Sequence, residues 1–300
     1  MNRSLITWTD FSGGNANFVW RGKQPGDCEF SPGCSNCYVM RFAPRVSSWP
    51  DTTTFFPDKL ASLIRFRPDA KFAPYRQGNN RPMVFVCDTG DYLHRNVTDD
   101  QVFAIWDALF KRADVDWQLL TKRARRLNDL AINWLNARKL SKFPPHMWLG
   151  VTIENEEQSF RWEYLRAIPA FVRYISYEPA IGFLKIESGP EWVIIGGESG
   201  RSRNDTRPMS FAYVSDAIDS LKNETAIYFK QWGNWIPFEQ LSDDDKRKSW
   251  HLKTIGQETF VWFTNRANDY DSYYNGKLLH QFPKTESAWD EWDKLCKLTD

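Results

Sequence analysis

The stretch MWLGVTIENEEQSFRWEYLRAIPAFVRYISYE, residues 147–178, contains two apolar runs separated by an amphipathic segment. The runs at 147–152 and 172–177 are rich in Val, Ile and aromatic residues and have the length of buried strands. Residues 156–167 between them place apolar side chains at helical spacing, which predicts a strand, a helix and a second strand. Nearly continuous apolar strands joined by helices are typical of a parallel sheet covered by helices.

The same alternation extends in both directions from this stretch. Further strand-length apolar runs lie at 5–8, 83–87, 117–120, 192–195 and 226–229, and further helical patterns lie at 99–112, 124–138 and 211–223. Thr98 is the predicted N-cap of the helix at 99–112. The alternation stops after Trp232. We therefore expect an α/β fold, a partial (β/α) barrel of about six parallel strands over residues 1–232, with an aromatic-rich α+β appendage over residues 233–300.

Bulk composition narrows the class of protein. The chain has 300 residues, 42% of them hydrophobic, and a formal net charge of +1. No apolar run approaches the length of a membrane span, and the N-terminus lacks the order of a signal peptide, so we expect a soluble, cytoplasmic protein with no membrane partner. The near-zero charge excludes a generally basic nucleic-acid-binding coat but leaves room for a local basic groove.

Three of the five cysteines lie close together as Cys28-x5-Cys34-x2-Cys37. A disulfide framework is not expected in a chain of this size. A structural zinc ion takes four ligands, and no further Cys or His lies nearby. Three thiolates suit a [4Fe-4S] cluster, whose fourth iron stays open to chelate S-adenosylmethionine (SAM). Chance clustering and a zinc site completed by a distant residue remain open as alternatives.

Seven short blocks of the sequence occur in an order that resembles a known family. They are Thr7–Asp10, Cys28–Tyr38, Leu120–Arg123, Trp148–Asn155, Tyr177–Pro179, Gly196–Gly200 and Phe229–Gly233. Together they resemble the phage and bacterial three-cysteine-motif proteins, which are regarded as radical-SAM-like. The resemblance covers residues 1 to about 235.

The resemblance implies a radical SAM enzyme with a [4Fe-4S] cluster on Cys28, Cys34 and Cys37. Such an enzyme cleaves SAM reductively to a 5′-deoxyadenosyl radical and needs an electron donor such as flavodoxin. The phage association points to a nucleic-acid base as substrate, foremost the isomerisation of a hypermodified thymidine in phage DNA. The alternatives are DNA repair as in spore photoproduct lyase, and a non-catalytic, metal-stabilised nucleic-acid-binding module.

Two features depart from the wider radical SAM superfamily. The common spacing is C-x3-C-x2-C, whereas five residues separate Cys28 from Cys34, and the aromatic residue Tyr38 follows the last cysteine. The superfamily's Gly-Gly-Glu usually follows the second strand, whereas Gly196-Gly197-Glu198 follows a late one.

Polar residues that follow the predicted strands are the candidates for cofactor binding, because the carboxyl ends of barrel strands form the active face. These candidates are Asp88, Asp91, Glu154, Asn155, Gly196, Gly197 and Glu198. An aspartate at 88 or 91 could pair with the ammonium group of SAM, and Glu154 and Asn155 could bind its ribose. Loop capping by the aspartates, an N-cap role for Asn155 and simple turn chemistry for the two glycines are the competing readings.

A second set of residues is assigned to catalysis or to nucleic-acid contact. Cys87, Lys122 and Glu178 are the catalytic candidates, with Cys87 either a hydrogen-atom donor or an inert core residue. Two basic runs follow strands and could hold phosphates, with Arg123, Arg126, Arg201 and Arg203 as the contacts. A solvated helix face is the alternative for these arginines.

Overall fold

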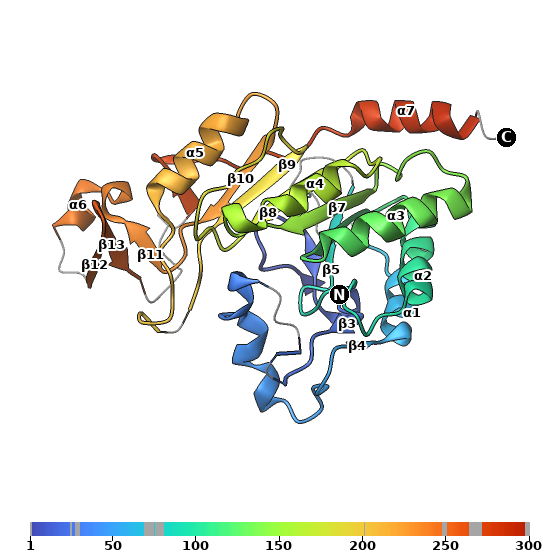
Figure 1. Ribbon diagram of the computed structural model, residues 1–300, viewed down its shortest axis with the longest axis horizontal. Coiled ribbons are helices and arrows are strands. Elements are labelled where there is room, and N and C mark those ends of the chain that lie inside the picture. The colour runs from blue at the N-terminus through green and yellow to red at the C-terminus, as the bar shows by residue number, and fades with distance from the viewer. Residues whose placement is uncertain are drawn as a thin grey trace.

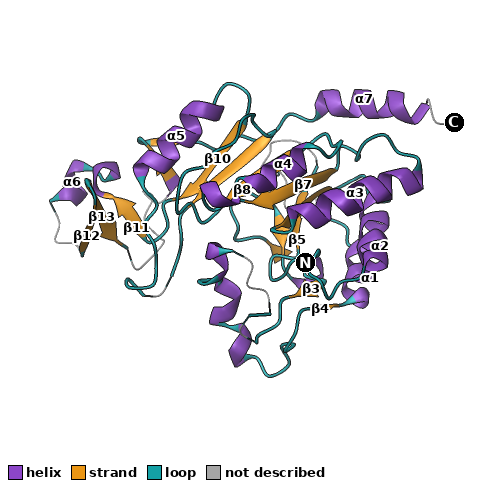
Figure 2. Ribbon diagram, in the orientation of Figure 1, coloured by secondary structure: helices purple, strands orange, loops and turns teal. Residues whose placement is uncertain are grey.

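The central sheet contains seven parallel strands in sequence order, with a short antiparallel strand at one edge (Figures 1 and 2). The computed structural model describes residues 2–24, 26–27, 31–68, 75, 81–200, 202–247, 251–263 and 272–297. The parallel order β2-β5-β6-β7-β8-β9-β10, with neighbours in the chain also neighbours in the sheet, is that of a half-barrel. The predicted α/β partial barrel is confirmed, with seven parallel strands where about six were expected.

The strands of this sheet are β1 (Asn2–Arg3), β2 (Phe11–Ser12), β5 (Met83–Val86), β6 (Asp116–Thr121), β7 (Met147–Thr152), β8 (Arg173–Tyr177), β9 (Trp192–Gly196) and β10 (Ala226–Gln231). The helices that connect or follow them are α1 (Pro57–Arg65), α2 (Asp99–Phe110), α3 (Ala124–Arg138), α4 (Phe160–Arg166) and α5 (Phe211–Leu221).

Most predicted elements form where expected. Thr98 caps α2 in a capping box, in which its hydroxyl accepts from the Gln101 N–H and the Gln101 side chain accepts from the Thr98 N–H. The predicted first strand at 5–8 is wrong. Residues 5–8 form a bend and a turn in which Leu5 is 98% exposed, and the strand that joins the sheet is β2, where Phe11 pairs with Val84.

The two faces of the sheet are both buried, but against different partners. One face packs on α2, α3, α4 and α5 through residues such as Leu119, Leu149 and Ile175. The concave face carries a smaller aromatic cluster that includes Trp148, Trp192 and Tyr228. Side chains alternate between these faces along each strand, so the residues of the concave face can be followed upward to the carboxyl edge.

The residues between β2 and β5 form an insertion that carries the cysteines. It contains the pair β3 (Val19–Trp20) and β4 (Thr54–Phe55), helix α1, and the 3-10 helices η2 (Pro32–Cys34), η3 (Tyr38–Arg41) and η4 (Ala43–Arg45). Figure 1 shows this blue segment on one side of the central strands.

The chain after β10 forms a small antiparallel sheet and a hairpin. A small sheet of β11 (Trp235–Pro237), β13 (Glu258–Trp262) and β12 (Leu252–Ile255) follows β10, together with α6 (Asp243–Lys246). The hairpin β14 (Tyr273–Tyr274) and β15 (Lys277–Leu278) leads to a segment that bonds along β10, where the Phe229 N–H donates to Leu279 O at 2.7 Å. The predicted boundary at residue 232 stays a prediction.

The last helix, α7 (Glu286–Lys297), lies at the amino ends of the strands. Trp289 stacks on His146, just before β7, and Trp292 contacts Phe171, just before β8. None of the helices in the described ranges is long and apolar enough to cross a membrane.

Candidate functional site

Four charged side chains form two ion pairs at the carboxyl edge of the sheet, and we name them the charged row: Lys122, Glu154, Glu178 and Lys230. Lys122 follows β6 and pairs with Glu154, which follows β7. Lys230 of β10 donates to Glu178 Oε1 at 2.6 Å, and Glu178 follows β8. Ser176 shares the face of Glu178, since its hydroxyl donates to Glu178 Oε2 at 3.2 Å. The strand ends therefore meet as the barrel rule predicts.

Glu154 is the most connected carboxylate of the charged row. It is fully buried and accepts hydrogen bonds from Ser31, Lys122 and Arg161, the last at 3.0 Å. Burial alone would raise the pKa of Glu154, but the charges of Lys122 and Arg161 outweigh it and the pKa is lowered. Glu154 is therefore a buried anion held by two cations.

A second buried carboxylate, Glu198, follows β9. Arg207 donates to it from the backbone N–H at 2.8 Å and from the guanidinium, and Asn36 Nδ2 donates at 3.0 Å. Burial opposes ionisation here too, and the bonds from Arg207 and Asn36 lower the pKa of Glu198.

The two carboxylates hold the cysteine segment, which we define as residues 31–38, across the carboxyl edge. Ser31 donates to Glu154 and Asn36 donates to Glu198. Arg207 Nη1 donates to Pro32 O at 3.1 Å, and the Tyr38 hydroxyl donates to the carbonyl of Asp88, which follows β5. The segment is thus fastened over the ends of three strands, β5, β7 and β9.

Two of the three predicted cluster ligands belong to this segment. Cys34 ends η2 and is 8% exposed, and Cys37 immediately precedes η3. The Ser31 hydroxyl lies 3.7 Å from Cys34 Sγ. Burial lowers the pKa of Arg161, and the nearby Glu154 and Cys34 act in the opposite direction. Cys28 lies outside the described residues, and within the described ranges no three His, Cys, Asp or Glu side chains are grouped to hold a metal ion.

The two aspartates after β5 have different environments. Asp91 is buried and accepts from Thr121 at 2.8 Å and from Arg123 at 2.6 Å, so it joins the loop after β5 to the end of β6. The backbone carbonyl of Asp88 accepts a hydrogen bond from the Tyr38 hydroxyl, and burial raises the pKa of the Asp88 carboxyl group.

The other cofactor candidates mostly contact the protein itself. The position of a Cβ on Gly196 would lie 2.5 Å from Glu178 Oε1, and one on Gly197 would meet the backbone of Trp232. The groups that come close to these two glycines therefore belong to the ends of the neighbouring strands. Asn155 precedes the 3-10 helix η6 (Glu156–Gln158) without capping it, and its buried Oδ1 has no hydrogen-bond partner in the described part of the chain.

Two of the predicted nucleic-acid contacts are already paired inside the protein. Arg123 bonds Asp91, and Arg126 donates to three backbone carbonyls at 93, 94 and 97 and to Asp99. Arg203 is exposed in the loop after β9, and Arg201 lies outside the described residues.

Cys87 lies at the end of β5 with a left-handed backbone, φ 58°. Its side chain is 2% exposed, its N–H donates to Ala16 O at 2.8 Å, and burial raises the pKa of its thiol. It is thus a neutral core thiol.

Three residues of the site carried no prediction of their own: Ser31, Asn36 and Arg161. Arg207 belongs to the basic run after Gly196-Gly197-Glu198 that was predicted to suit phosphates, and in the structure it bonds Glu198. Ser31 and Asn36 flank the cysteines, which is a usable signal. Arg161 could be found from a different signal. It lies one turn from Leu165 on the apolar stripe of its helix, where a charge is unexpected.

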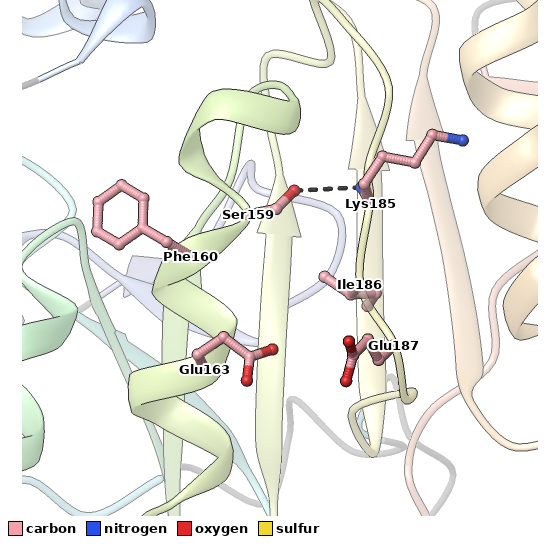
Figure 3. A pocket seen from close by; sticks show the side chains of 6 residues that line it. All are labelled: Ser159, Phe160, Glu163, Lys185, Ile186 and Glu187. Carbon is pink, nitrogen blue, oxygen red and sulfur yellow. Dashed lines mark hydrogen bonds between the residues drawn. The ribbon is translucent and has the colours of Figure 1, made fainter.

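A surface depression lies away from this site, between α4 and the segment at 185–187 (Figure 3). It is lined by Ser159, Phe160, Glu163, Lys185, Ile186 and Glu187. The Lys185 N–H donates to the Ser159 hydroxyl at 3.1 Å, as the dashed line marks. None of these residues belongs to the charged row or to the cysteine segment.

The comparisons with known proteins give a family but no activity. Neither a search of curated proteins nor a search of solved structures gives a match. One family model matches residues 3–283, which includes the half-barrel, the cysteine segment and the segment bonded along β10. The chain therefore belongs to the family described as "Protein of unknown function (DUF5131)".

Proposed function

We propose that this protein is a radical SAM enzyme that holds a [4Fe-4S] cluster on Cys28, Cys34 and Cys37. The observation that carries the proposal is the attachment of the cysteine segment across the carboxyl ends of β5, β7 and β9. Cys34 and Cys37 therefore lie at the edge where the catalytic groups of parallel barrels gather, which supports the proposal.

The residues around the cysteines suit an anionic cluster. Cys34 is nearly buried, and the charges of Lys122 and Arg161 exceed that of the single carboxylate between them, Glu154. A net positive charge there attracts the negatively charged cluster that thiolate ligands would form. Three thiolates with an open fourth iron are also the donor set that SAM chelation requires.

When bound, the cluster and SAM supply a one-electron cleavage of the sulfonium, with 5′-deoxyadenosine as the readable product. The chain's own residues would bind and orient SAM and the substrate. Asn155 Oδ1 is a buried acceptor without a partner among the described residues, which favours it as a contact for SAM. Lys122, Glu178 and Lys230 remain part-exposed and can contact a polar substrate.

The test is anaerobic reconstitution with iron and sulfide, followed by dithionite and SAM, with dithionite replacing a natural donor such as flavodoxin. The wild-type protein is expected to turn brown and to release 5′-deoxyadenosine. Cys34→Ala should lose both signals, whereas Cys296→Ala, in α7 at the other end of the barrel, should keep them. A colourless zinc protein that ignores SAM would support the non-catalytic, metal-stabilised module instead.

For the substrate we propose a nucleic-acid base, on the strength of the resemblance to phage proteins. A duplex base must leave the stack to reach residues at the carboxyl edge of the sheet. Exposed Arg203 and Arg125 remain available for phosphates, while Arg123 and Arg126 are paired internally. Mass spectrometry of nucleosides from DNA treated with the reduced enzyme tests this. A rearranged thymidine or a repaired lesion would support it, and unchanged nucleosides from every DNA tested would contradict it.

A further inference from the structure

Ser31 contacts both the cysteine Cys34 and the charged row. Its hydroxyl donates to Glu154 Oε1, and its Oγ lies 3.7 Å from Cys34 Sγ. The residue has an extended backbone, φ −159°, and its carbonyl accepts from the Cys34 N–H at 2.8 Å. Ser31 is therefore fixed beside the sulfur by its main chain and beside the carboxylate by its side chain.

The hydroxyl of Ser31 has one proton and two acceptors within reach. Without a metal, the Cys34 thiol can donate to Ser31 Oγ while Ser31 donates to Glu154. A metal-bound cysteine sulfur has lost its proton and only accepts. The Ser31 hydroxyl can then rotate and donate its hydrogen bond to the sulfur.

Glu154 can lose the hydrogen bond from Ser31 at a low cost in free energy. Its carboxylate keeps a bond from Lys122 and one from Arg161, whose guanidinium lies at 3.0 Å from Oε2. Both of these donors are cations, so each bond adds an attraction between opposite charges that the neutral Ser31 hydroxyl does not supply. The buried carboxylate therefore stays satisfied after Ser31 turns away.

We propose that Ser31 is a positioning residue that donates its hydroxyl hydrogen bond to the Cys34 sulfur in the cluster-loaded protein. The inference rests on the proposed function and adds a residue that sets the electronic properties of the cluster. Hydrogen bonds to the sulfurs stabilise the more negative, reduced form of an iron–sulfur cluster and raise its reduction potential.

The test is a redox titration of the reconstituted protein, with the midpoint potential as the readout. Ser31→Ala is expected to shift the potential to a more negative value, and Ser31→Thr, which keeps the hydroxyl, is expected to restore it. Ser35→Ala is the matched control, because Ser35 lies in the same segment but its hydroxyl donates to Pro32 O at 2.9 Å. The control should leave the potential unchanged.

Ser31→Val and Ser31→Thr have the same shape and differ in the hydroxyl, so this pair repeats the comparison. A Ser31→Val potential as negative as that of Ser31→Ala, with the Ser31→Thr potential near the wild-type value, supports the proposal. Equal potentials in wild type, Ser31→Ala and Ser31→Val overturn it, as does an equal shift in Ser35→Ala. A wild-type protein that forms no cluster would instead contradict the proposed function.

Discussion

Gly33 illustrates how a single missing side chain positions the cysteines. A Cβ at this position would lie 2.7 Å from Glu154 Oε1, which is closer than real Cβ contacts, and 3.0 Å from Pro179 Cδ, which is tighter than most of them. Gly33→Ala should therefore push the cysteine segment away from the carboxyl edge, while the sheet stays folded. We expect a several-fold lower iron content after reconstitution, with an unchanged circular dichroism spectrum.

Ser35→Ala again provides the comparison for Gly33→Ala, since it changes the same segment without a new contact at Glu154. Full iron uptake by Gly33→Ala would show that the segment does not depend on its seat against Glu154.

The sequence identified the residues of this site better than their roles. The cysteines and the carboxylates at 154 and 198 stand out because of their motifs and their places after apolar runs. Their partners lie far away in the chain: Ser31 and Glu154 are 123 residues apart, and Asn36 and Glu198 are 162 apart. In the structure Glu154 and Glu198 attach the cysteine segment, and their predicted contact with a cofactor stays a prediction. Pairings at such separations depend on the topology and leave no local pattern.

Helix α7 closes the amino end of the half-barrel over a buried histidine. His146 stacks on Trp289, its Nε2 lies 3.1 Å from Phe110 O, and burial lowers its pKa to about 4. In the unfolded chain the group titrates near 6.5. Between these two values the unfolded state binds the proton and the folded state does not, so stability falls as the pH falls.

The expected loss attributable to His146 is about 3 kcal/mol between pH 7 and pH 4. Urea denaturation across this range should show it as a difference between the wild type and His146→Gln, a variant that keeps a polar side chain without the titration. The variant should lose less stability on acidification. Parallel pH profiles for the two proteins would refute the assignment.

Elements with a strong local pattern were predicted best. The strand at 147–152 and the helix at 124–138 form at the expected residues, because their apolar spacing and their burial agree. The run at 5–8 failed, because the Ser4 N–H bonds to Asp10 O and closes the residues between them into a turn. Helix α1 was missed, since it belongs to an insertion outside the βα alternation.

The candidate site lies at one end of the half-barrel, and helix α7 covers the other end. The cysteine segment lies at the carboxyl ends of the strands, while α7 contacts residues before β7 and β8. Removal of the residues after 284 should therefore lower the melting temperature, because Trp289 and Trp292 leave their aromatic partners, and should leave iron uptake per folded chain unchanged.

Thermal unfolding and iron analysis of the truncated protein check both expectations. Loss of iron binding in a chain that remains folded would show that the two ends are not independent.

The most direct test of the central claim, a three-cysteine [4Fe-4S] site that binds SAM, is electron paramagnetic resonance of the reconstituted and reduced protein with and without SAM. The account predicts about four iron and four sulfide ions per chain and a cluster signal that changes when SAM is added. A protein that carries zinc, or a cluster whose signal SAM leaves unchanged, would contradict it.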